Sequence, residues 1–194
     1  ENLQVLVAEE TKRLSRMVNR MLDAAKIQSG ELILSPAPFD FTEMTAQILL
    51  SFEQKIEKKK LDVQCDLEER LTVMGDRDHL YRAVYNLTDN AVKFSEDGGT
   101  LKLKVHQEGP LCVFAISNTG IGISAEDLPH VFDRFYKTDR SRSMDKTGAG
   151  LGLYIVKNII NLHGGEISVR SGGGETEFEF TLPLAPEQNR QNNT

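Results

Sequence analysis

Apolar residues recur along the chain with two different periods, and the change of period divides it into elements. From residue 3 to residue 29 they follow the i, i+3, i+4, i+7 spacing of an amphipathic helix, and Gly30 supplies a stop signal. The apolar positions of this helix are Leu14, Met17, Val18, Met21 and Ala25. A lone helix of this kind is marginal in water. We therefore expect it to pair with a second chain, with packing onto its own domain as the alternative.

Beyond Gly30 the pattern predicts short strands alternating with helices. The expected strands, with their period of two, are 32–34, 61–65, 71–73, 101–105, 111–117, 167–169 and 178–182. The expected helices are 41–60, 76–94 and 151–162, and Asp76 is a natural N-cap for the second. The predicted fold class is α+β: an α/β sandwich of a mixed, mainly antiparallel sheet with three helices on one face, preceded by one long helix.

Composition removes several classes of function. Hydrophobic residues at 39% and charged residues at 27% are ordinary for a soluble globular protein, and the net charge of -6 argues against a nucleic-acid partner. No apolar run approaches the roughly 18 residues that cross a bilayer. Cys65 and Cys112 lack the spacing of metal ligands, and we expect both to be reduced and buried.

The helix predicted after Asp76 carries unusual polar residues. Its buried stripe is expected to be Leu80, Ala83, Val84, Leu87, Ala91 and Phe94. Asn86, Asn90 and Lys93 fall at i, i+4 and i+7 on a different side. Asparagine is a mediocre helix former, so two in register need a reason. One interpretation is solvent-facing polarity. The other is that the amide oxygens coordinate Mg²⁺ while Lys93 offsets phosphate charge.

Three alternating glycines, Gly148, Gly150 and Gly152, stand before the last predicted helix. A dinucleotide fingerprint needs a different spacing directly after a strand, and a Walker A loop ends in Gly-Lys-Ser/Thr, so neither fits. A loop that offers backbone N–H groups and a helix dipole to phosphate remains, with a merely solvated loop as the alternative. The polar segment 139–147 before it is expected to form a mobile basic lid that is poorly ordered without nucleotide.

In combination these features resemble the catalytic domains of sensor histidine kinases. The N, G1, F and G2 boxes of that family are matched, in order, by residues 86–95, 118–123, 132–136 and 147–153, and His163-Gly164-Gly165 also fits. Residues 13–22 resemble the second helix of the family's dimerisation and phosphotransfer hairpin. The implied organisation is a truncated hairpin helix at 1–30, a catalytic ATP-binding domain at 31–185 and a disordered tail at 186–194. Residue 1 falls inside a helical pattern, so we expect a fragment of a longer protein.

The resemblance implies a Bergerat (GHKL) ATP-binding fold that transfers the γ-phosphoryl group of Mg-ATP to a histidine, for relay to a response-regulator aspartate. It implies that Asn86 and Asn90 hold Mg²⁺. The implied catalytic residues are Asn86, Lys93 and Lys137, of which Lys93 reaches phosphate and Lys137 approaches the γ-phosphate. Those three and Asn90 also belong to the implied nucleotide-binding set, whose other members are Asn118, Gly120, Gly122, Phe132, Thr147, Gly148, Gly150, Leu151 and Gly152.

The chain departs from the family pattern in two respects. None of His79, His106, His130 and His163 has the context of the acceptor histidine, so we expect the acceptor on another segment. Asn118 stands where the G1 box usually has the aspartate that accepts from adenine N6. The implied partners are ATP or ADP, a response-regulator receiver domain, and a second copy joined through the N-terminal helix in the cytoplasmic portion of a membrane-anchored sensor. The alternatives are a degenerate nucleotide-binding module with weak or no kinase activity, or another GHKL ATPase.

Overall fold

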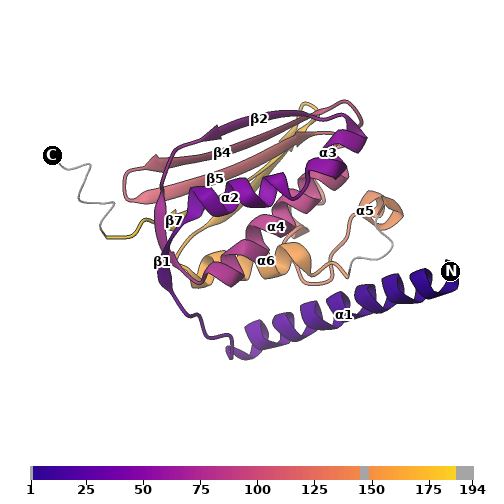
Figure 1. Ribbon diagram of the computed structural model, residues 1–194, viewed down its shortest axis with the longest axis horizontal. Helices are drawn as coiled ribbons and strands as arrows, with labels where there is room; N and C mark the ends of the chain where they lie inside the picture. The colour runs from indigo at the N-terminus through magenta and orange to yellow at the C-terminus, as the bar shows by residue number, and fades with distance from the viewer. Residues whose placement is uncertain (1, 145–148, 187–194) are drawn as a thin grey trace.

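The computed structural model describes residues 2–144 and 149–186, as a long helix beside a layer of helices on a sheet (Figure 1). The helices are α1 (Asn2–Ser29), α2 (Phe41–Leu50), α3 (Glu53–Lys59), α4 (Arg77–Phe94), α5 (Asp139–Met144) and α6 (Gly152–Leu162), with a 3-10 turn η1 (Leu128–His130). The strands are β1 (Ala37–Asp40), β2 (Asp62–Leu67), β3 (Thr72–Gly75), β4 (Thr100–Glu108), β5 (Leu111–Thr119), β6 (Ile167–Gly172) and β7 (Glu175–Pro183). The predicted tail falls almost wholly on residues 187–194, outside the described residues.

Five strands form the main sheet in the order β2-β4-β5-β7-β6. Strand β2 pairs parallel with β4 and the other pairs are antiparallel, while β1 and β3 form a separate antiparallel ladder. Helices α2, α4 and α6 cover one face of the main sheet (Figure 1). The predicted α+β fold class, with a mixed and mainly antiparallel sheet, is therefore confirmed.

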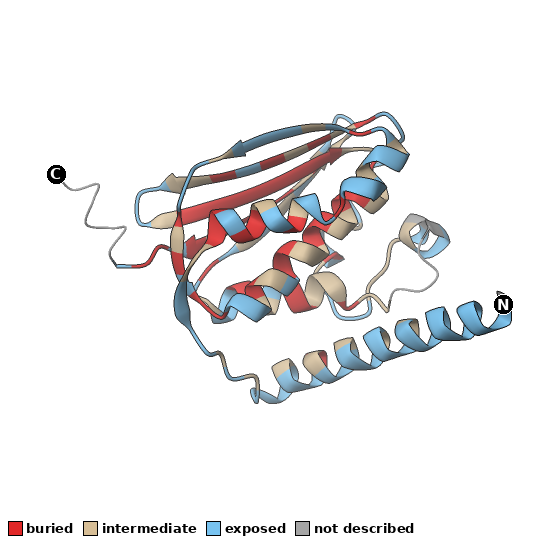
Figure 2. Ribbon diagram, in the orientation of Figure 1, coloured by how far each residue is buried: buried red, intermediate tan, exposed pale blue. Residues whose placement is uncertain are grey.

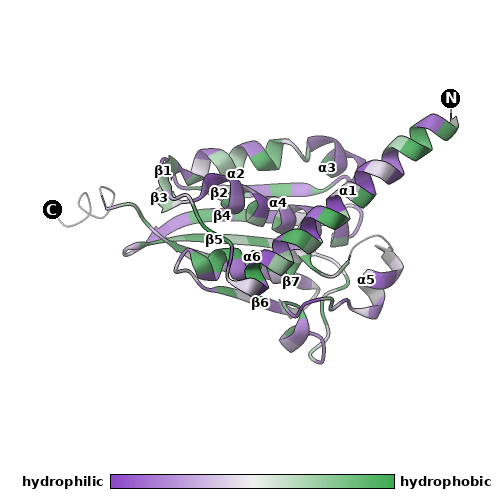
Figure 3. Ribbon diagram, turned by 90° about the horizontal axis from the view of Figure 1, so that it is seen from below, coloured by the Kyte–Doolittle hydropathy of each residue, from purple (hydrophilic) through white to green (hydrophobic). Residues whose placement is uncertain are grey.

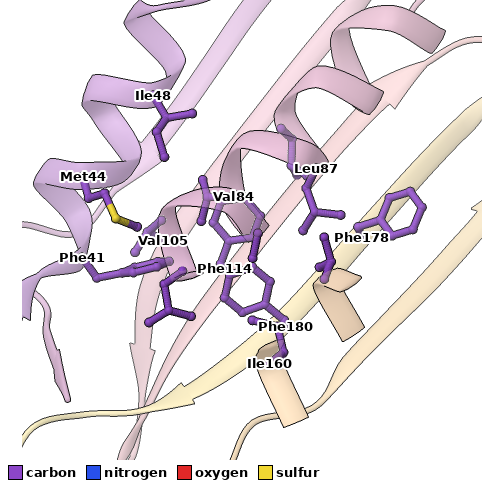
Figure 4. Packing of buried hydrophobic residues seen from close by; sticks show 14 of the residues in the cluster. Phe41, Met44, Ile48, Val84, Leu87, Val105, Phe114, Ile160, Phe178 and Phe180 are labelled. Carbon is purple, nitrogen blue, oxygen red and sulfur yellow. The ribbon is translucent and has the colours of Figure 1, made fainter. Parts of the chain in front are cut away.

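The core lies between these three helices and the sheet. Figure 2 shows the buried positions along β5 and on the inner sides of α2, α4 and α6. In the close view of Figure 4, Phe114 of β5 stacks on Phe180 of β7 with ring centroids 4.6 Å apart. Phe41, the first residue of α2, meets both rings edge-on. Such rings bury a large apolar area, and their pairing adds roughly 0.5–1.5 kcal/mol beyond it.

Helix α1 docks on its own domain through one side only. Figure 3 shows α1 lying alongside α6, which it contacts. Ala24 of α1 is buried, and Arg82 Nη1 of α4 lies 2.7 Å from Asp23 Oδ2. Leu14 and Val18 of the predicted stripe stay 59% and 54% exposed. Helix α1 therefore packs on its own domain, but most of its apolar stripe remains exposed to solvent. Pairing with a second chain stays a prediction.

The structure corrects the sequence reading around the first strand. Residues 31–36 have no regular structure, and the strand begins at Ala37, inside the expected proline-rich break. Proline is tolerated on edge strands because its missing N–H can face away from the ladder. Pro38 lies on such a strand, since β1 pairs only with β3 among the described residues.

The expected single helix over 41–60 is two helices, α2 and α3. Ser51 ends the first by donating from Oγ to the carbonyl of Ile48 at 2.6 Å. Phe52 turns inward and packs against Tyr85 with ring centroids 4.9 Å apart. The chain leaves helical geometry at this junction, and Phe52 is buried there. Periodicity alone did not reveal this break.

Burial was also wrong at two positions. Cys112 is buried on the central strand β5, where desolvation and the charge of Glu68 raise the pKa of its thiol to about 12. Cys65 is exposed, because β2 is one of the two edge strands of the main sheet. Phe94 was expected in the buried stripe of α4, but it is half-buried and lines a pocket. No helix in residues 2–144 or 149–186 combines the length and hydropathy needed to cross a membrane.

Candidate functional site

Two adjoining pockets lie beside the C-terminal half of α4. The inner pocket, of about 120 Å³, reaches the end of β5, and the outer pocket, of about 110 Å³, reaches the first residues of α6. Asn90, Phe94 and Lys137 line both, so the two pockets form one continuous site. An extended ligand with an apolar end and a charged end would fit this arrangement.

The inner pocket has apolar walls and a small polar end. Its walls include Phe94, Ile123, Val131, Leu153 and Phe178. Asn118, 6% exposed, and Thr176, 7% exposed, stand opposite each other on β5 and β7 at the polar end. Nδ2 of Asn118 makes a long contact of 3.5 Å to the carbonyl of Thr119. Its Oδ1 has no partner among the described residues and is available as an acceptor.

Thr176 was missed by the sequence analysis. Its Oγ1 lies 2.8 Å from Ser171 Oγ, which accepts a hydrogen bond from the backbone N–H of Ile123 at 2.8 Å. These contacts join β6, β7 and the loop after β5 around the polar end of the inner pocket. Only the strand register places Thr176 beside Asn118, and no local pattern signals that pairing.

The outer pocket presents the amides predicted on α4. Asn86 and Asn90 are half-buried one helical turn apart, and both line this pocket. Neither carboxamide has a hydrogen-bond partner within the described residues. Asp89 between them is engaged by two lysines, with Lys55 Nζ at 3.1 Å and Lys93 Nζ at 3.5 Å. The two amide oxygens are therefore left for a ligand.

This donor set fits Mg²⁺. The ion prefers hard oxygen ligands and commonly takes only one or two from the protein, the rest coming from phosphates and water. The described residues contain no group of three or more His, Cys, Asp or Glu that could hold a metal. A cation here would depend on Asn86 and Asn90 and on the oxygens of a bound ligand.

The glycines of the outer pocket differ in what they do. Gly150 has φ +71°, and a Cβ there would lie 2.7 Å from the carbonyl carbon of Phe135, so the fold itself requires glycine. Gly152, the first residue of α6, has a normal φ, and a Cβ there would meet no atom within 4 Å. The fold does not demand glycine at this position. Its missing side chain leaves open space at a helix N-terminus, where backbone N–H groups favour an anion. Thr147 and Gly148 lie outside the described residues.

Three residues that were predicted to bind nucleotide line neither pocket and instead pack next to residues of the site. A Cβ on Gly120 would lie 2.3 Å from the carbonyl oxygen of Phe94, so glycine lets this loop cross the end of α4. Leu151 is 1% exposed in the core. Phe132 packs edge-on behind Phe178, which does line the inner pocket. Gly122, by contrast, lines the inner pocket directly.

The predicted lid contains a helix that the sequence did not suggest. Thr138 Oγ1 accepts from the backbone N–H of Ser141 at 3.0 Å and so caps α5. The Tyr136 hydroxyl donates to the Asp127 carboxylate, which raises the pKa of Tyr136 and lowers that of Asp127. Tyr136 and Ser141 line both pockets, so this segment covers the site. Its order with and without nucleotide stays a prediction.

His163 ties together the two helices that carry the outer pocket. At the end of α6 its Nε2 accepts from the backbone N–H of Asp76 at 2.9 Å, and its Nδ1 donates to the carbonyl of Ile159 at 2.7 Å. This arrangement requires a neutral ring, and burial lowers the pKa of His163 accordingly. Burial would raise the pKa of Asp76, but hydrogen bonds from Ser35 and His79 bring it to about 2. The start of α4 is thereby fixed to the end of α6.

Comparison with known proteins agrees with this geometry. Residues 75–186 match the family model described as histidine kinase-, DNA gyrase B-, and HSP90-like ATPase. Over 185 residues the chain is 33% identical to the sensor histidine kinase YclK of Bacillus subtilis. That alignment covers 94% of this chain and 39% of YclK, so the chain spans about two fifths of the length of this relative.

Solved structures show the same fold. Full-length ShkA in complex with AMPPNP superposes with a TM-score of 0.80 at 27% identity, covering 95% of this chain and 39% of that one. The histidine kinase ThkA in complex with the response regulator TrrA superposes with a TM-score of 0.73 at 27% identity, covering 94% and 51%. The chain therefore belongs to the histidine kinase-, DNA gyrase B- and HSP90-like ATPase family, as a homologue of the catalytic domains of sensor histidine kinases.

Proposed function

We propose that this chain binds ATP together with Mg²⁺ and transfers the γ-phosphoryl group to a histidine carried on another segment. The observation that carries the proposal is the outer pocket. There the carboxamides of Asn86 and Asn90, which have no partner among the described residues, line the same pocket as Lys93 and Gly152 at the open N-terminus of α6. Oxygen ligands, a cation and backbone donors in one pocket suit a metal-bound polyphosphate.

Each part of the site then has a distinct task. The apolar walls of the inner pocket hold the adenine, and Asn118 accepts from its amino group. Lys93 and Lys137 line the outer pocket and offset charge on the phosphates. The N–H groups at the start of α6 fix the phosphate chain. When bound, Mg²⁺ would neutralise phosphate oxygens, and catalysis in such sites is mostly positioning and charge stabilisation.

We propose two protein partners for this chain. The complex of ThkA with TrrA suggests a response-regulator receiver domain as the final acceptor of the phosphoryl group. The exposed stripe of α1, including Leu14, Val18 and Met21, suggests pairing with a second copy. We also propose that the whole protein is a membrane-anchored sensor with this domain in the cytoplasm and no nucleic-acid partner. A module that binds nucleotide without kinase activity is the second candidate, and Asn118 is the feature that favours it.

A transfer assay separates these two functions. The purified chain is incubated with γ-labelled Mg-ATP, alone and with a separately supplied phosphotransfer hairpin. We expect nucleotide binding without self-labelling, because none of the four histidines has the sequence context of the acceptor histidine, and we expect acid-labile label on the hairpin. Acid-labile label on the chain itself would contradict the first expectation. Tight Mg-ATP binding with no label on any hairpin tested would favour the non-kinase module.

Asn118→Asp is expected to tighten ADP binding and to widen the preference for adenine over guanine nucleotides. A carboxylate accepts from the adenine amino group more strongly than an amide and repels the guanine carbonyl. The expected gain is roughly 1 kcal/mol, or fivefold to tenfold in affinity. Calorimetric titration of both variants with ADP and GDP measures it. Unchanged affinities would mean that another group, such as Thr176, reads the base.

A further inference from the structure

Helix α1 carries a basic residue into the outer pocket. Arg20 is half-buried and lines this pocket together with Asn86, Lys93 and Gly152, although it lies far from them in sequence. Arg16, one turn earlier on α1, is exposed and lines neither pocket. The difference between these two arginines comes from the way α1 lies on the domain.

The docking of α1 is held by contacts in the two turns that follow Arg20. Asp23 forms its ion pair with Arg82 at 2.7 Å, and the side chain of Gln28 accepts from Arg134. Ala24, one turn after Arg20, is 4% exposed. These contacts hold the C-terminal part of α1 on the domain, and in this position Arg20 lines the outer pocket.

The charge around Arg20 favours an anion. Asp89 is the one acidic residue among the described residues that line the outer pocket, and it is already engaged by Lys55 and Lys93. Among the described residues Arg20 has no ion-pair partner. A guanidinium that faces a pocket already lined by Lys93 and Lys137 would repel its neighbours unless a negative ligand lay between them.

We propose that Arg20 binds the terminal phosphate of the nucleotide, so that α1 supplies part of the nucleotide site. Arg20 lines the outer pocket and not the inner one, which places it at the end of the site away from Asn118. A guanidinium suits phosphate because it donates several hydrogen bonds in one plane. The inference rests on the proposed nucleotide binding and adds a ligand from outside the domain that matches the family.

Nucleotide binding and the docking of α1 are then coupled. If Arg20 contacts the terminal phosphate, a nucleoside triphosphate stabilises the docked position of α1, and a diphosphate does so less. By linkage, loosening α1 weakens triphosphate binding by the same factor. The ion pair between Asp23 and Arg82 thus sets both the position of the helix and the affinity of the site.

Calorimetric titration with Mg-AMPPNP, Mg-ADP and adenosine tests the proposal on the whole chain. Arg20→Ala is expected to weaken AMPPNP binding about tenfold, ADP binding less, and adenosine binding not at all. Arg16→Ala removes the same charge from the same helix and is expected to change none of the three. Arg20→Lys keeps the charge and is expected to recover part of the loss. Thermal unfolding of each variant confirms that the fold is kept.

A second pair of variants tests the coupling. Arg82→Ala is expected to weaken AMPPNP binding, and adding Arg20→Ala to it should cause little further loss, because the two act through one contact. Equal AMPPNP affinities for Arg20→Ala, Arg16→Ala and the unaltered chain would overturn the role of Arg20 alone. An unaltered chain that binds none of the nucleotides would overturn the proposed function and this inference with it.

Discussion

Asn90→Ala is expected to weaken Mg-ATP binding by about 100-fold, the largest effect we predict for a single side chain. Asn90 lines both pockets, and its carboxamide has no partner within the described residues. Removing a ligand oxygen costs metal affinity directly, and even the outer-shell partners of metal ligands are each worth about 10–100-fold. The loss should be confined to buffers that contain Mg²⁺.

The measurement is a nucleotide titration of each variant in Mg²⁺ and again in EDTA. In EDTA the unaltered chain and Asn90→Ala should bind nucleotide with similar, weak affinities. Asn161→Ala serves as the control, because Asn161 is an exposed helical asparagine on α6 that lines neither pocket. Equal losses in the two buffers would show that Asn90 shapes the pocket and does not bind the metal.

Gly152→Ala is expected to lower nucleotide affinity more than tenfold while leaving the fold intact. A Cβ at this position meets no protein atom within 4 Å, so the substitution causes no clash in the unliganded chain. Alanine is also a better helix former than glycine by roughly 1 kcal/mol, so stability should hold or rise. The methyl group would instead occupy the space where phosphate approaches the N–H groups of α6, and hydrogen bonds to a charged group are worth about 1.5–3 kcal/mol each.

Gly172→Ala provides the matched control for this prediction. A Cβ on Gly172 of β6 also meets nothing within 4 Å, but this glycine lines neither pocket. Chemical unfolding and ADP titration of both variants give the comparison. If Gly152→Ala bound nucleotide as tightly as Gly172→Ala, the open space at the start of α6 would not be a phosphate site.

Much of the fold could be read from local pattern. The Asp76 cap and the stripe after it predicted α4, and Asp76 does accept from the backbone N–H of His79. Alternation on both sides of Gly109 predicted the hairpin of β4 and β5. These signals are reliable because capping and side-chain periodicity depend on residues only a few positions apart.

The same reasoning failed where distant segments compete with local preference. Residues 41–60 have a continuous helical pattern, yet burial of Phe52 against Tyr85 breaks the helix. Residues 32–34 are apolar enough for a strand, but the partner strand β3 pairs with Ala37–Asp40 instead. Cys65 is exposed because sheet order puts β2 at an edge.

For the site, the sequence determined the chemistry of α4 and of the glycine loop. Asn86, Asn90 and Lys93 line the outer pocket because residues three or four positions apart on a helix share a side. Gly150 precedes the last helix and Gly152 is its first residue, so the glycines lie at its start as the sequence predicted. The family resemblance rested on these short motifs and was confirmed by the match over residues 75–186.

Only the tertiary structure decided which other residues join them. Thr176 reaches the inner pocket through strand register with Asn118, and Arg20 reaches the outer pocket because α1 docks beside α6. The tertiary structure also showed that the two glycines differ: a side chain at Gly152 would meet open space, whereas the fold requires glycine at Gly150. The physical reason is that sequence periodicity records which side of an element is apolar, whereas contacts between distant segments depend on how those sides pack in three dimensions.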